Sequence, residues 1–328
     1  MFPNRPVRAP SPERGDTLHP YRRVRSTGTL LAATLLLGLA ASACGGAAAA
    51  PATGTTAPAE TTATESQPAV EPTATTMTTD VDGEAWFAGF HVTFGTATAE
   101  LDSNGGTVLI EAEFENTGDE EARLDATLDL AYGGEHATEG FEMDIPSVPG
   151  GLVSDGLFAF SVDETFTFDD AVLTLGRSGN QQAIVPLSPA AGEARTLEPV
   201  EVQVSGAAQA DDLKLELRSG ELRADLPWNH GQSEDDSYVL ELVYDATFDS
   251  DFAGGFAFTA ENVALTLPDG TSVGVIQDGE SQSIELIGTA STMKDLFSRF
   301  EIDDPASGDY VLLVRSFGDE AEIPFSIP

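Results

Sequence analysis

The sequence predicts an all-β protein in which two tandem antiparallel β-sandwiches follow a disordered N-terminal signal and stalk. Three observations predict this class. Beyond residue 80, short runs of alternating apolar and polar residues end at Gly, Asp or Asn, as strands and turns do. The apolar pattern of the first half recurs in the second, and residues 1–80 lack a pattern that builds a core. We therefore predict sandwiches at 81–188 and 199–328, joined by a linker at 189–198.

The N-terminal 43 residues have the three parts of an export signal. Residues 1–25 contain six arginines and two acidic residues, and residues 29–40 form an uncharged apolar run. This run suits the apolar core of a signal peptide and is well below the roughly 20 residues of a membrane-spanning helix. Small residues then precede Cys44, which is the one cysteine of the chain. We interpret residues 1–43 as a signal peptide.

The string LAASAC at residues 39–44 resembles the lipobox of bacterial lipoproteins. The resemblance implies that the Cys44 thiol carries diacylglycerol, which anchors the protein to the extracytoplasmic face of the cell membrane. Ala41 departs from the family, which usually has leucine at that position. The alternatives are an ordinary cleaved signal and an uncleaved membrane anchor. The pair at residues 22–23, both arginine, leaves twin-arginine export open beside the general secretory route.

Residues 44–80 predict a disordered stalk. Their composition is mostly Ala, Thr, Pro, Gly and Glu, and no apolar residue larger than valine occurs between Gly45 and Met77. Such a segment cannot bury enough apolar surface to offset the entropy of ordering it. A flexible chain of about 35 residues spans roughly 30–35 Å. We therefore expect the stalk to hold the folded part away from the membrane.

The folded part shows a strand pattern that is repeated. Residues 108–114 alternate between apolar and polar side chains and match residues 238–244 at a separation of 130. Phe158 and Ile184 match Phe297 and Ile323 at a separation of 139, and residues 99–101 match 220–222 at 121. Along the chain the separation between matching residues rises from 121 to 130 and then to 139. We therefore predict that the second half is a copy of the same sandwich with two loops that are each about nine residues longer. Residues 291–300 are the one segment for which a short helix is the alternative to a strand.

The string FENTGD at residues 114–119 resembles the strand-and-turn signature of immunoglobulin-like domains in bacterial surface lipoproteins. Many of those families have no assigned function. The resemblance covers both halves of the folded part. It implies that each half is an immunoglobulin-like β-sandwich.

The net charge of the chain is −40, and without residues 1–43 it is −44, from 9 basic and 53 acidic residues. A nucleic-acid partner is therefore not expected, because its phosphates are bound by Lys and Arg. The charge also opposes direct adsorption to anionic lipid, so the acyl chains on Cys44 would provide the attachment. Solubility in a salty environment explains the charge, and binding of divalent cations is the alternative.

The candidate calcium ligands lie in or beside the two loops expected to be longer in the second copy. Calcium takes six to eight oxygen ligands, several of them from carboxylates. The alternative is that acidic residues cluster without a metal in so acidic a chain. No other cofactor is expected. The candidate metal ligands are Glu234, Asp235, Asp236, Asp245, Asp249 and Asp251.

The candidate ligand-binding residues are Trp228, Asn229 and His230, in the string PWNHG. A tryptophan on a loop beside Asn and His suits stacking on a sugar ring or a partner surface. The alternative is a tryptophan folded back over the edge of the sandwich. Of four nearby phenylalanines, 256 and 258 are expected to enter a strand, which leaves 248 and 252 as exposed candidates.

No residue is assigned a catalytic role. Ser291 and Lys294 have the Ser-x-x-Lys spacing of penicillin-interacting enzymes, but the Lys-Thr-Gly and Ser-Asp-Asn partner motifs are missing from the sequence. Neither a His-x-x-x-His metal motif nor a Gly-x-Ser-x-Gly elbow is present. We therefore expect a protein without enzymatic activity.

These patterns lead to one functional hypothesis with two alternatives. The hypothesis is a lipid-anchored extracytoplasmic protein that presents two immunoglobulin-like domains to an envelope partner, either a protein or a glycan. The first alternative is a structural spacer without a specific ligand. The second is a calcium-dependent binding module.

Overall fold

The computed structural model describes residues 74–138, 144–278, 280–281 and 284–327. The predicted signal peptide, Cys44 and most of the predicted stalk lie outside these residues. The described part is all-β, with antiparallel sheets and one 3-10 turn, η1 (Ala260–Asn262). Within these ranges, no helix has the length and apolar character needed to cross a membrane.

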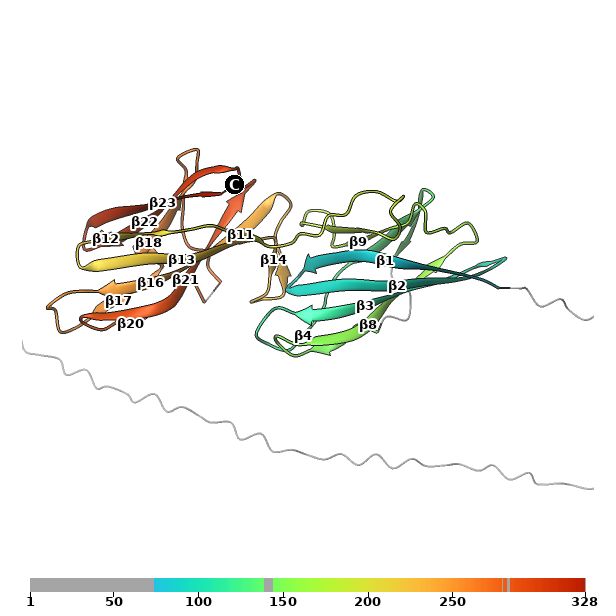
Figure 1. Cartoon of the computed structure of the whole chain (residues 1–328), viewed down its shortest axis with the longest axis horizontal. Helices are drawn as coiled ribbons and strands as arrows, with labels where there is room; N and C mark the ends of the chain where they lie inside the picture. Colours follow the sequence, from blue (N-terminus) through green and yellow to red (C-terminus); the bar gives the residue numbers. More distant parts are fainter. Residues whose placement is uncertain (1–73, 139–143, 279, 282–283, 328) are drawn as a thin grey trace, which may run out of the picture. The chain divides into compact units, whose positions relative to one another are not determined.

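The first half contains two four-stranded sheets and one short strand pair (Figure 1). One sheet has the order β1 (Thr75–Phe87), β2 (Phe90–Asp102), β3 (Gly105–Asn116) and β8 (Val153–Val162). The other has the order β10 (Ala183–Pro186), β9 (Val172–Leu175), β5 (Leu128–Tyr132) and β6 (Glu135–Thr138). The short pair is β4 (Ala122–Arg123) with β7 (Ser147–Val148).

The second half is built in the same way. One sheet has the order β11 (Val200–Val202), β13 (Leu213–Arg223), β16 (Ser237–Phe248) and β21 (Ser291–Asp303), and β12 (Gly206–Ala210) also pairs with β13. The other has the order β19 (Ser272–Val273), β18 (Val263–Thr266), β22 (Gly308–Ser316) and β23 (Asp319–Ile327). Two short pairs are β14 (Asp225–Leu226) with β15 (Gly231–Gln232), and β17 (Phe256–Phe258) with β20 (Glu285–Ile287).

The two halves repeat one strand order. The order β1-β2-β3-β8 corresponds to β11-β13-β16-β21, and the order β10-β9-β5-β6 corresponds to β23-β22-β18-β19. Each half has its own hydrophobic cluster, and each cluster takes residues from both of its sheets. Alternate residues of β3 and of most of β16 are buried, as the period-2 pattern predicts. Each fully buried large aliphatic or phenylalanine side chain stabilises its half by about 1.5–3 kcal/mol.

The register of the repeat differs from the prediction. Ile110 lies opposite Phe158 and its equivalent Leu240 lies opposite Phe300, so Phe300 rather than Phe297 matches Phe158. The prediction was therefore wrong by three positions. Since the side-chain period of a strand is two, an odd shift moves a residue to the other face, and Phe297 lies outside the core cluster that holds Phe300.

Two further matches are shifted. Leu173 pairs with Val185 and Leu312 with Ile323, so Val185 rather than Ile184 matches Ile323. Ile110 pairs with Ala97 and Leu240 with Leu222, which shifts the match of residues 99–101 as well. The loops of the second half are therefore not lengthened by two equal steps. Apolar residues at several nearby positions made the shifted alignments look equally good.

The structure decides one alternative that the sequence left open and corrects two local assignments. Residues 291–300 belong to strand β21, whose pairing with β16 runs from Ser291 to Asp303 and outweighs the local helical tendency. Strand β1 begins at Thr75, so residues 75–80 are part of a sheet and not of the stalk. In the predicted linker, Arg195 bridges to Ile184 and Leu197 belongs to the first core.

The register generates a test with a matched pair of variants. Phe300 is fully buried, whereas Phe297 is only partly buried on the outer face. We expect Phe300→Ala to lower the free energy of unfolding of the second half by about 3–5 kcal/mol. Phe297→Ala should cost about 1 kcal/mol, since it loses mainly its contact with Arg299.

Urea unfolding followed by Trp228 fluorescence, in a Trp86→Phe background, measures this difference in the second half. The register would be contradicted if Phe297→Ala were the more destabilising of the two variants.

Candidate functional site at the junction of the two halves

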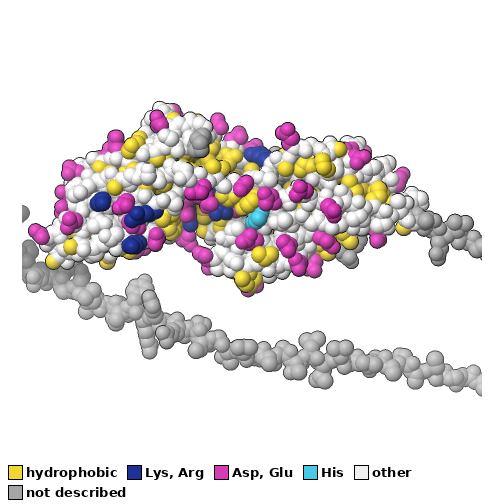
Figure 2. Space-filling view, viewed as in Figure 1, with side chains coloured by type: hydrophobic (Ala, Val, Ile, Leu, Met, Phe, Trp, Pro, Cys, Tyr) yellow, Lys and Arg dark blue, Asp and Glu magenta, His cyan; other side chains and the backbone are white. Residues whose placement is uncertain are grey.

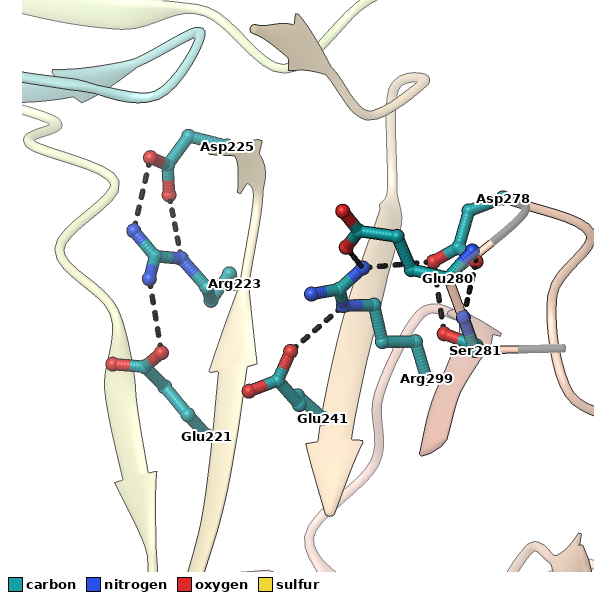
Figure 3. Close-up of polar contacts among 8 residues, drawn as sticks. All are labelled: Glu221, Arg223, Asp225, Glu241, Asp278, Glu280, Ser281 and Arg299. Carbon is teal, nitrogen blue, oxygen red and sulfur yellow. Dashed lines mark hydrogen bonds and ion pairs between the residues drawn. The ribbon is translucent and has the colours of Figure 1, made fainter. Parts of the chain in front are cut away.

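The hairpin β14–β15 carries the residues that were predicted to bind a ligand. Its base is held by Asp225, which is fully buried and accepts hydrogen bonds from Arg223 Nε and Nη2, each at 3.1 Å (Figure 3). Burial lowers the pKa of the Arg223 guanidinium, but the charges of Asp225 and Glu221 outweigh burial and raise it. At the tip, the Asn229 carboxamide oxygen accepts a hydrogen bond from Gly231 N at 2.9 Å. The hairpin is thus ordered by the second half itself.

Pro227 of this hairpin approaches two glycines of the first half closely. A Cβ atom at Gly89 would lie 2.9 Å from Pro227 Cα, and one at Gly118 would lie 2.6 Å from the Pro227 carbonyl oxygen. Gly89 also has a φ of +76°, in the left-handed region that favours glycine. The His230 ring lies 5.9 Å from the Phe90 ring. Only residues without a side chain at these two positions allow the hairpin to reach the first half.

Backbone hydrogen bonds extend this contact. Gln181 N donates to the carbonyl of Ser233 at 3.0 Å, and Asp235 N donates to the carbonyl of Gly179 at 3.1 Å. Ala88 N donates to the Gln232 side-chain oxygen at 3.0 Å. The fully buried Gln181 also donates from its side chain to the Ser237 carbonyl at 3.2 Å. In the core, Ala224 belongs to the first cluster and Tyr238 packs against both clusters.

Arg299 of β21 holds the other side of the junction. Its Nε donates to Glu241 at 2.7 Å, and its Nη1 donates to Asp278 at 2.9 Å and to Glu280 at 3.0 Å (Figure 3). Its guanidinium also lies 3.7 Å from the centre of the Trp228 ring. Burial lowers the pKa of Arg299, but its three carboxylate partners outweigh this effect and raise it. A buried guanidinium needs such partners because its desolvation is costly.

A cleft of about 350 Å³ lies at this junction. Residues 117–120 of the first half line it together with Arg223, Trp228 and Arg299 of the second half. Both arginines are already paired with carboxylates, and one face of the Trp228 ring is covered by Arg299. The buried atoms Trp228 Nε1 and His230 Nδ1 have no hydrogen-bond partner among the described residues. The two arginines that line the cleft are therefore not free for an anion, and Arg299 occupies one face of the Trp228 indole.

Trp228 thus packs against Arg299 of its own half, whereas His230 contacts Phe90 of the first half. Asn229 is exposed and closes the turn between them. The alternative of a tryptophan that folds back is the one that the structure favours. Residues 117–120, which line the cleft, lie more than a hundred positions earlier in the chain, so no local sequence signal reveals the approach of Gly118 to Pro227 and His230. Gly89 and Gly118, which make room for the hairpin, are visible in the sequence. Glycine is common in turns, however, so these two residues alone do not indicate a contact with the hairpin.

The predicted calcium ligands do not converge. Residues 234–236 precede β16 and residues 249 and 251 follow it. At about 3.3 Å per residue, the 12 residues of β16 separate these two groups by roughly 40 Å. Asp245 lies within β16, is buried, and is paired with Arg218. Within the described ranges, no three His, Cys, Asp or Glu side chains form a group suited to a metal.

Asp245 has a structural partner. Arg218 Nε donates to its carboxylate at 3.0 Å and Arg218 Nη2 makes a second hydrogen bond to it. Asp295 N donates to its other oxygen at 3.2 Å. The hydrogen bond from Arg218 lowers the pKa of Asp245. This acid therefore ties β13, β16 and β21 together.

Ser291 and Lys294 lie on strand β21. Three positions apart in a strand, two side chains point to opposite faces, whereas in a helix they would share one. Ser291 Oγ donates to the Gly288 carbonyl at 2.7 Å. Of the four phenylalanines, Phe256 and Phe258 lie in β17 as predicted, and Phe252 is exposed as predicted. Phe248 is fully buried because it continues the inward face of β16, so that expectation was wrong.

No protein-family model and no curated protein matches this chain. The geometry of the described residues therefore carries the functional conclusion.

The close approach of Pro227 generates a test. We expect Gly118→Ala to open the junction, because the added Cβ meets the Pro227 carbonyl and overpacking of this kind costs about 1–3 kcal/mol. Hydrogen exchange of the Gln181 and Asp235 amides should then become about tenfold faster or more. Gly274→Ala is the matched control, since its Cβ would have nothing within 4 Å. Equal exchange in the two variants would show that Pro227 does not hold the junction.

The Arg299 cluster generates a test of pH dependence. Burial raises the pKa of Asp278, but hydrogen bonds from Arg299 and Ser281 outweigh burial and lower it below its usual value. A carboxylate with a lowered pKa stabilises the fold above its unfolded pKa of about 3.9 and loses this contribution at lower pH.

We therefore expect Asp278→Asn to lower the melting temperature at pH 7, with a deficit that shrinks as the pH falls below about 4. Thermal unfolding across this range measures it, with Asp249→Asn as the exposed control. A deficit that stayed constant with pH would contradict the role of the ionised carboxylate.

Proposed function

We propose that this chain is a lipid-anchored, non-enzymatic protein of the extracytoplasmic side that presents two immunoglobulin-like sandwiches to an envelope partner. The observation that carries the proposal is the junction, where the hairpin of the second half is bonded to one end of the first. Because the two halves are bonded to each other, an anchor that precedes the first half would also restrain the second half. Such coupling is what a presenting protein requires.

The strand order supports the immunoglobulin-like assignment. In each half the chain forms three neighbouring strands, crosses to the other sheet for two strands, and returns to the first sheet beside its third strand. The last two strands then complete the second sheet. This Greek-key path through two antiparallel sheets is typical of immunoglobulin-like sandwiches.

The proposed anchor is diacylglycerol on Cys44, followed by a stalk that ends where β1 begins at Thr75. Figure 2 shows acidic side chains spread over the visible face of the described part and few basic ones. An anionic membrane surface would repel such a protein, so the acyl chains would hold it. The partner would be a protein or a glycan of the envelope.

The spacer without a specific ligand remains the second candidate. It is favoured by the position of Trp228 and His230, which contact other parts of the chain. A calcium-dependent module has less support, because β16 separates the two acidic loops.

Lipidation of Cys44 is tested by metabolic labelling with a fatty-acid probe. We expect the wild-type protein to carry the label and to stay with the membrane fraction. Cys44→Ser should lose the label and be released from the membrane. Ser42→Ala, which keeps the cysteine, is the control. Equal labelling of Cys44→Ser and wild type would overturn the anchor.

A further inference from the structure

A second cleft, of about 370 Å³, lies at the junction of the two halves. It shares His230 with the cleft described above, but neither Trp228 nor the two paired arginines line it. This volume is within the range of roughly 300–1,000 Å³ that small-molecule sites occupy, and such sites are frequent between domains. Its lining residues are Phe87, Ala88, residues 125–127, Gly176, Arg177 and Asn180 of the first half and residues 230–232 of the second half.

Arg177 is held at this cleft by a contact that depends on both halves. Its Nε donates to Asn180 Oδ1 at 3.1 Å. Asn180 Nδ2 in turn donates to the carbonyls of Gln232 and Ser233, each at 3.2 Å. No carboxylate of the described ranges forms an ion pair with Arg177. Its two Nη groups are therefore available to an acceptor in the cleft.

Asp125 is the one carboxylate that lines the second cleft. Its side chain is exposed, and it has neither a hydrogen bond nor an ion pair within the described part of the chain. A guanidinium and a carboxylate thus line one cleft without contacting each other. A ligand that carries both a negative and a positive group would pair with both of them.

The charges around the cleft restrict the ligand further. Exposed residues of both signs lie near its lining residues in the chain without lining it themselves: Arg123, Arg195, Glu234 and Asp235. The chain as a whole is strongly acidic, and its net charge opposes the approach of a ligand with net negative charge. A carboxylate that binds the cleft arginine should therefore belong to a molecule that is neutral overall.

The wall of the cleft contains a buried donor that lacks a partner. Gln232 Oε1 accepts a hydrogen bond from Ala88 N at 3.0 Å, which identifies the other end of the carboxamide as the NH₂ group. This Nε2 atom is buried and has no hydrogen-bond partner among the described residues. A buried unsatisfied donor costs stability, and an acceptor bound in the cleft would satisfy it. Phe87 and Ala88, which are almost fully buried, add an apolar part to the same wall.

We propose that the second cleft binds the zwitterion of a free amino acid with a small apolar side chain. The Nη groups of Arg177 donate to the α-carboxylate, and Asp125 accepts hydrogen bonds from the α-ammonium group. The side chain of the amino acid contacts Phe87 and Ala88. The site goes beyond the proposed presenting function and does not depend on the lipid anchor. Because both halves line the cleft, the bound amino acid also bridges the junction.

Isothermal titration calorimetry of the purified full chain at pH 7 tests this proposal, with L-alanine as the probe. We expect alanine to bind saturably. Propionate, which lacks the ammonium group, and alaninamide, which lacks the carboxylate, should each bind about tenfold more weakly or less. Absence of alanine binding would show that the cleft holds water only. Equal binding of propionate would show a simple anion site, and binding of glucose in place of alanine a sugar site; each result would overturn the proposal.

Two variants localise the binding. Arg177→Gln should weaken alanine binding by about tenfold or more, because it removes the partner of the carboxylate. Asp125→Asn should reduce the preference for alanine over propionate to about threefold or less, because it removes the partner of the ammonium group. Only variants that keep the wild-type melting temperature are compared.

Lys294→Gln and Asp249→Asn are the matched controls. They make the same changes of charge at exposed positions that do not line the cleft, and they should leave both the affinity and the preference unchanged. Equal effects of the cleft variants and the controls would show a response to net charge alone and would overturn the site.

Discussion

The contact of Pro227 with two glycines is the constraint on which the rest of the described structure depends. Side chains at positions 89 and 118 would meet the backbone of Pro227, so only glycine allows the hairpin to reach the first half. Once it is seated, backbone hydrogen bonds form between residues 179–181 and 233–235, and Arg299 covers Trp228. These contacts link two halves that each have their own core.

The charged side chains fall into two groups, those in arginine–carboxylate pairs and those exposed on the surface. Three arginines of the second half, Arg218, Arg223 and Arg299, each bind at least two carboxylates. Its other basic residues, Lys214, Lys294 and Arg315, are exposed. Buried charges are stable only when they are paired in this way. Most other acidic residues are exposed. The surface of the described part is consequently acidic, with a few exposed basic residues among the carboxylates.

The strands were predictable from the sequence because the side-chain period of a strand is local. The burial of Ile110, Phe114, Leu240 and Tyr244 follows directly from their alternation. The register of the repeat was not predictable, because Phe297 and Phe300 are both aromatic and the ladder to β16 decides which one is buried. The surroundings of Trp228 were not predictable for a related reason, since Arg299, which covers one face of its ring, lies 71 positions later in the chain. The acids on either side of β16 are near one another in the sequence, but the extended strand between them keeps them apart in the structure.

The sequence by itself determined the all-β class, the repeated alternation and the strongly acidic charge, and it predicts the anchor at Cys44. These properties depend on composition and on neighbours along the chain. Tertiary structure decided which phenylalanine enters the core, which carboxylates pair with arginine, and that the hairpin residues 228–230 join the two halves. It also decided that Phe252, Leu286 and Phe317 are exposed whereas Phe248 is buried. The physical reason is that burial and pairing depend on residues brought together by sheet register, and register is set by the whole ladder rather than by any one segment.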